Sequence, residues 1–124
     1  MTQAFQDLLQ RAYQEGRKAG AAVAPHPMLV AHCDINGKLD TSQPIYRVDD
    51  GACGFAWVKV RPATTPFARW LKKNDYARQA YSGGLDIWVS EFGQSVDRKY
   101  AMASAMAKVL SEAGITAYAD SRLD

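Results

Sequence analysis

Two long stretches of the chain carry apolar side chains at every third or fourth position, which predicts two amphipathic helices. In residues 2–20, Gly16 and Gly20 are expected to weaken and then end the helix. In residues 95–113 the apolar face is broader, and Ser95 is a suitable N-terminal cap. The apolar positions are Phe5, Leu8, Leu9, Ala12 and Tyr13 in the first helix, and Val96, Tyr100, Met102, Ala103, Met106, Ala107, Val109 and Leu110 in the second.

Apolar and polar residues alternate in three shorter stretches, residues 53–60, 85–92 and 115–119, which is typical of strands. A short helix follows the first of them, with Thr65 as its cap and Pro66 at its first position. Strands that alternate with helices predict an α+β domain of two layers. We therefore expect residues 51–124 to form an α/β-like strand-helix-strand-helix-strand core around a mixed sheet.

Residues 1–50 read as an extension of that core, consisting of the N-terminal helix and a β-hairpin. Two prolines within residues 24–27 interrupt the helical pattern. Residues 29–35 alternate as a strand, and Asn36-Gly37 then favours a two-residue hairpin turn into residues 38–40. Residues 45–48 are expected to form a further short strand.

Composition places the chain among ordinary globular proteins. It has 124 residues, of which 48% are hydrophobic, and two cysteines, so we expect one domain over residues 1–124 without a disulfide framework. No apolar run is long enough to span a membrane, and no signal peptide is visible at the N-terminus. A cytoplasmic location is the expectation.

The net charge of +2 is unevenly distributed. Residues 51–84 hold six basic residues and only one acidic residue, a net of +5, whereas the flanking segments are weakly acidic. A local basic patch favours an anionic partner, although basic residues such as Lys72 and Lys73 are also typical of a solvated helix face.

Strand periodicity places aromatic and basic residues together on one face of the sheet. The members of this candidate nucleic-acid-binding surface are Phe55, Trp57, Lys59, Arg61, Trp88 and Tyr118. Bases stack on aromatic rings and phosphates pair with Lys or Arg, so such a surface suits single-stranded nucleic acid. Two alternatives remain open. The N-terminal helix would make the aromatics part of the core if it covered this face, and a homodimer would bury them in its interface.

A second candidate site is an anion site at the joints between strands and helices. If the strands run parallel, their carboxyl ends meet at one edge and bring together Arg61, Ser95, Arg98 and Arg122. A helix start with a serine and an arginine can hold a phosphate or carboxylate, as in a nucleotide-like small molecule. Ordinary helix capping explains the same residues equally well.

Signs of catalysis or metal binding are weak. Cys53, between glycines, is the better candidate nucleophile, with His26 or His32 as its base, whereas Cys33 falls on the apolar face of its strand. His32 and Cys33 point to opposite faces, and no zinc-ligand spacing is present, so no metal and no cofactor are expected.

Four runs in residues 51–124 carry a resemblance to a known family: GACGFAWV (51–58), FARWLKK (67–73), GGLDIWVS (83–90) and AYADSRLD (117–124). The chain resembles a family of small bacteriophage and prophage proteins. This resemblance implies a phage-borne protein acting in a bacterial host cytoplasm, and it implies no activity or site residues.

Together these patterns favour a non-enzymatic accessory protein that binds nucleic acid, or a host complex that handles nucleic acid, through its aromatic and basic surface. The alternatives are a binder or modifier of a phosphorylated or nucleotide-like small molecule at the strand–helix joint, and an interaction protein that dimerises through its aromatic face. No membrane partner is expected.

Overall fold

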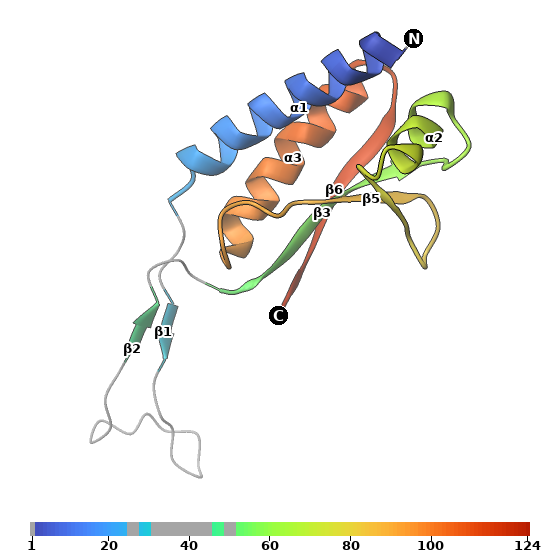
Figure 1. Cartoon of the computed structure of the whole chain (residues 1–124). Helices are drawn as coiled ribbons and strands as arrows, with labels where there is room; N and C mark the ends of the chain where they lie inside the picture. Colours follow the sequence, from blue (N-terminus) through green and yellow to red (C-terminus); the bar gives the residue numbers. More distant parts are fainter. Residues whose placement is uncertain (1, 25–27, 31–45, 49–51) are drawn as a thin grey trace.

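The computed structural model describes residues 2–24, 28–30, 46–48 and 52–124 (Figure 1). The helices are α1 (Thr2–Ala22), α2 (Pro66–Lys73) and α3 (Val96–Glu112), and the strands are β1 (Met28–Val30), β2 (Tyr46–Val48), β3 (Gly54–Arg61), β4 (Arg78–Gln79), β5 (Leu85–Trp88) and β6 (Thr116–Leu123). The three helices and strands β3 to β6 occupy two layers, which confirms the predicted α+β class.

The main sheet has four strands in the order β4-β5-β3-β6. Every pairing in it is antiparallel, so the expectation of a mixed sheet is wrong. Strand β3 lies between β5 and β6, which both run in the opposite direction to it. Helix α2 connects β3 to β4 across β5, and α3 connects β5 to β6 across β3. From β3 onward, this order of elements and strands is the split β-α-β connectivity of ferredoxin-like sheets.

One face of the sheet carries the core. Alternation along β3 turns Ala56, Val58 and Val60 to this face, where all three are fully buried. Leu85 and Ile87 of β5 extend the same apolar surface. Buried residues of all three helices belong to the same cluster: Leu9 and Ala12, Phe67, Ala68, Trp70 and Leu71, and Met102, Ala103, Met106, Ala107, Val109 and Leu110. The helices therefore all pack on one side of the sheet.

Helix α1 lies along α3, and the two predicted helix breakers are in the contact between them (Figure 1). Gly16 and Gly20 are buried within a helix that continues to Ala22. A Cβ atom at Gly16 would lie 2.7 Å from Met106 Cγ and 2.9 Å from Met102 Cγ. The expectation that Gly20 ends the helix is wrong, because α1 continues to Ala22. The small size of Gly16 permits the close approach of α1 to α3.

The helix starts agree with the sequence. Thr65 caps α2 by accepting from the Ala68 N–H at 3.2 Å, and Ser95 caps α3 by accepting from the Arg98 N–H at 3.4 Å. One predicted apolar position of α3 differs, because Tyr100 is 44% exposed, whereas its neighbour Lys99 is buried.

Two strand ends differ from the sequence pattern by several residues. Strand β5 ends at Trp88 rather than Phe92, and β6 continues to Leu123 instead of ending at Ala119. The extension of β6 follows β3, which it pairs from Gly54↔Leu123 to Arg61↔Thr116. The two-residue strand β4 had no alternating pattern that would predict it.

Strands β1 and β2 form a separate antiparallel pair. Leu29 pairs with Arg47, so the partner of this strand in the described residues is the short strand predicted at 45–48. The predicted Asn36-Gly37 turn and residues 38–40 lie outside the described residues. Within the described ranges, no helix is long and apolar enough to cross a lipid bilayer.

Candidate functional site

The face of the main sheet opposite the helices is the candidate site, and we call it the open face. Within the described residues no helix packs on this face, because α1, α2 and α3 all belong to the core on the other side. Its members are Phe55, Trp57, Lys59 and Arg61 of β3, Arg78 of β4, Asp86 and Trp88 of β5, and Thr116, Tyr118, Asp120 and Arg122 of β6.

Helix α1 does not cover these aromatic residues, which excludes one of the two alternatives left open by the sequence. Its Phe5 ring instead contacts Phe67 and Trp70 of α2, at centroid distances of 5.4 and 5.8 Å. Leu9 and Ala12 point into the core that holds Val58. The aromatic residues of the open face therefore lie outside the core under α1.

Antiparallel pairing brings the aromatic residues of neighbouring strands together. Trp57 pairs with Trp88, and their ring centroids are 4.8 Å apart with the planes tilted by 39°. Phe55 meets Trp88 edge-on at 6.2 Å. Trp88 keeps 38% of its surface exposed and Tyr118 on β6 keeps 42%. The open face thus presents two accessible aromatic side chains, Trp88 and Tyr118, and both Trp57 and Phe55 pack against Trp88.

Two exposed arginines lie near opposite ends of this aromatic surface. The Arg61 guanidinium is 5.9 Å from the Tyr118 ring centroid, and that of Arg122 is 5.2 Å from the Phe55 centroid. Arg61 and Phe55 are six positions apart in β3, so their backbone positions lie about 20 Å from each other along the strand. Both cations lie within reach of a ligand that stacks on the aromatic surface.

Lys59 is on the open face but is not accessible there. It is only 4% exposed, and its Nζ lies 2.8 Å from Asp86 Oδ1 on the neighbouring strand. The same ammonium donates to Ser82 Oγ at 3.1 Å and to the Gly83 carbonyl at 3.0 Å. Lys59 therefore ties the 80–84 turn to the sheet, and the expectation that it meets a phosphate does not hold.

The predicted anion site is divided between the two ends of the sheet. Arg61 pairs with Thr116 at one end, whereas Arg122 pairs with Phe55 at the other, near Ser95 and the start of α3. The strands are antiparallel, so their carboxyl ends do not share an edge. Ser95 is also 2% exposed and engaged in its cap. Arg98 lies with Ser95, but these four residues do not form one site.

The structure adds little support for catalysis or metal binding. Cys53 is exposed and free, and its backbone bridges Ser95. Its proposed bases, His26 and His32, and also Cys33, lie outside the described residues. Among the residues that are described, no cluster of three metal-ligating side chains occurs.

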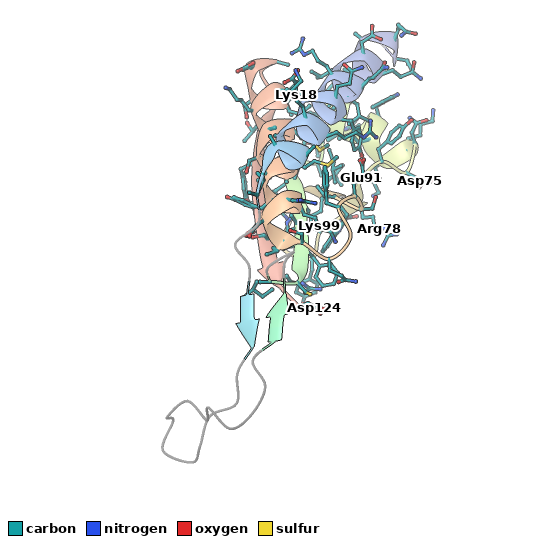
Figure 2. All side chains as sticks on the ribbon, turned by 90° about the vertical axis from the view of Figure 1, so that its left-hand side faces the viewer. Lys18, Asp75, Arg78, Glu91, Lys99 and Asp124 are labelled. Carbon is teal, nitrogen blue, oxygen red and sulfur yellow. The ribbon has the colours of Figure 1, made fainter. Side chains whose placement is uncertain are left out.

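A groove borders the open face beyond β5. One part, of about 330 Å³, is lined by Trp88, Asp86, Tyr76 and Arg78, and it adjoins a second part lined by Tyr13, Arg17 and Glu91. Figure 2 shows Asp75, Arg78 and Glu91 on this flank of the molecule. Burial raises the pKa of the Tyr13 hydroxyl, with a smaller opposing effect of Arg17. The sequence did not reveal this groove, because Tyr76 precedes a strand of only two residues.

Comparisons with protein-family models, with curated proteins and with solved structures found no match for this chain.

Proposed function

We propose that the open face binds single-stranded nucleic acid and that the protein is a binding module without catalytic activity. One observation carries the proposal: Trp88 and Tyr118 are exposed on a sheet face that no described helix covers, with Arg61 and Arg122 beside them. Aromatic side chains on an open four-stranded sheet are the means by which known modules of this connectivity stack bases.

Two kinds of interaction would contribute to the binding energy: stacking of bases on aromatic side chains, and ion pairs of arginines with phosphates. A base stacked on an aromatic side chain contributes about 1–3 kcal/mol and tolerates any sequence, because every base has a flat face. Arg61 and Arg122 supply the cationic contacts to the backbone at the two ends of the surface. These two contacts alone would make the logarithm of the affinity fall with the logarithm of salt at a slope of about −1.4.

The test compares two variants that each replace an exposed aromatic residue by leucine. Trp88→Leu keeps an apolar contact for Trp57 but removes the flat surface on which a base would stack. Tyr100→Leu is the matched control, because Tyr100 is similarly exposed but lies on α3, in the helix layer. Fluorescence anisotropy with labelled mixed-sequence DNA and RNA 12-mers should show about 5- to 100-fold weaker binding for Trp88→Leu and no change for Tyr100→Leu.

A second pair of variants tests the cations. Arg61→Gln/Arg122→Gln removes two charges from the open face, and Arg11→Gln/Lys108→Gln removes two exposed charges from α1 and α3. The first pair should lose most of the salt dependence, whereas the second should change it little. No binding of any 12-mer at low salt, or equal losses in both pairs, would refute the proposal.

The same variants separate a homodimer from nucleic-acid binding. If the open face is a dimer interface, the wild type should have twice the chain mass in light scattering, and Trp88→Leu should be a monomer. A wild-type dimer that dissociates in this variant and binds no oligonucleotide would replace the present proposal. A phage origin and a host complex as partner remain predictions of the sequence.

A further inference from the structure

Asp120 is an exposed carboxylate among the aromatic residues of the open face. It pairs with Trp57 across β6 and β3, and Trp57 pairs with Trp88 on the next strand. Trp88, Trp57 and Asp120 therefore form one row that crosses three strands, each about 4.8 Å from the next. A base that lies on the tryptophan pair would have its edge close to Asp120.

The carboxylate is held in place by its own backbone. Asp120 Oδ1 accepts the N–H of Ser121 at 2.8 Å, which leaves the other oxygen free to accept from a ligand. No ion pair of Asp120 is formed within the described part of the chain, and the nearby Arg122 lies over Phe55 instead. A carboxylate that is ordered, charged and exposed on a stacking surface accepts hydrogen bonds and repels other acceptors.

We infer that Asp120 selects the stacked base, favouring guanine and disfavouring thymine or uracil; this inference rests on the proposed function. Guanine presents two adjacent donors, N1–H and the N2 amino group, which match a carboxylate. Cytosine and adenine present one amino donor. Thymine and uracil place their single N3–H between two carbonyl oxygens, which the carboxylate repels. The same charge keeps phosphates away from the middle of the surface and leaves them to Arg61 and Arg122.

The experiment uses the full chain and labelled DNA 10-mers. One is all thymidine, a second carries a single central guanine in the same thymidine background, and a mixed-sequence 10-mer reports binding as such. The wild type should bind the guanine 10-mer at least about fivefold more tightly than the thymidine 10-mer. Asp120→Asn should lose this preference and bind the thymidine 10-mer more tightly, because the amide is uncharged and keeps an oxygen for the Ser121 N–H.

Glu112→Gln is the matched control, since it removes one exposed negative charge from the end of α3. It should leave the preference for guanine unchanged. If the wild type binds all three 10-mers equally, or if Asp120→Asn keeps the preference, the role of Asp120 is refuted while the proposed function stands. If the wild type also fails to bind the mixed-sequence 10-mer, the proposed function fails and this inference fails with it.

Discussion

The pair of Lys59 and Asp86 gives the sharpest test of how the open face is stabilised. Replacing Lys59 by methionine keeps most of the side-chain volume but removes the ammonium. The side chain of Asp86 is only 13% exposed, so its charge would then lose its partner in a largely dry place. The bonds to Ser82 Oγ and the Gly83 carbonyl would be lost as well.

The magnitude follows from the burial of both groups. Breaking a fully buried ion pair costs about 3–5 kcal/mol, and the partial exposure of Asp86 reduces this to about 3 kcal/mol for Lys59→Met. Asp86→Leu should cost about 2 kcal/mol, because the long lysine chain can turn its ammonium toward water. The double variant leaves no buried charge, so it should lose only about 1–2 kcal/mol instead of the sum of about 5. The coupling energy is then about 3 kcal/mol.

Urea denaturation followed by tryptophan fluorescence measures all four proteins of this cycle. For a chain of this length, Lys59→Met should also melt about 10 °C lower than the wild type. If the two single changes add within about 0.5 kcal/mol, Lys59 and Asp86 do not interact as described. Lys59 would then have to be considered again as a cation available to a ligand.

Three further predictions concern the turn, the helix caps and the half-buried Tyr13. Gly84→Ala should lower the free energy of unfolding in urea by at least about 2 kcal/mol, because Gly84 has φ +70° and a Cβ atom would lie 2.8 Å from the Val60 carbonyl oxygen. Gly83→Ala is the control and should cost less, because a Cβ atom there has open space around it. Equal costs would contradict the close contact at Gly84. Ser95→Ala and Thr65→Ala should each lower the free energy of unfolding in urea by about 1 kcal/mol, because each removes the hydroxyl that caps a helix. An unchanged stability in either variant would show that the corresponding cap is not formed. Burial raises the pKa of Tyr13 above its ordinary value of 10.0, so the stability that its neutral form contributes is present below pH 10 and is lost as the pH rises through the raised value. The free energy of unfolding measured across this range should therefore fall less in Tyr13→Phe than in the wild type. Identical pH curves for the two proteins would show that the ionisation of Tyr13 is not coupled to folding.

Strand periodicity was sufficient to predict which side chains share the open face. Phe55, Trp57 and Arg61 face away from Val58 because alternation in an extended strand is a local property of the backbone. The direction of the neighbouring strands is not local, and the parallel arrangement that would unite Arg61 with Ser95 is absent from the described sheet. The register of strand pairing, which places Trp57 beside both Trp88 and Asp120, depends on contacts between distant segments and could not be predicted from the alternation within each strand.

One lysine and two glycines show a different limit of prediction from the sequence. Lys59 has the same spacing as the exposed Arg61, but the turn that covers it follows more than 20 positions later in the chain. Gly16 and Gly20 are unfavourable in an isolated helix, but a larger residue would meet Met102 and Met106 at position 16 and Phe92 at position 20. In both cases a contact distant in sequence reverses the local expectation.

The packing of α1 explains why the aromatic residues remain on the surface. Its small residues Ala12, Gly16 and Gly20 recur every four positions and form a narrow seam that fits closely against α3. A helix has only one face at this spacing, so α1 cannot pack along α3 and also cover the opposite side of the sheet. The extra helix therefore thickens the helix layer of a ferredoxin-like sheet instead of closing its other face. Trp88 and Tyr118 remain exposed for a geometric reason, and the ligand that we propose would bury them where the described helices do not.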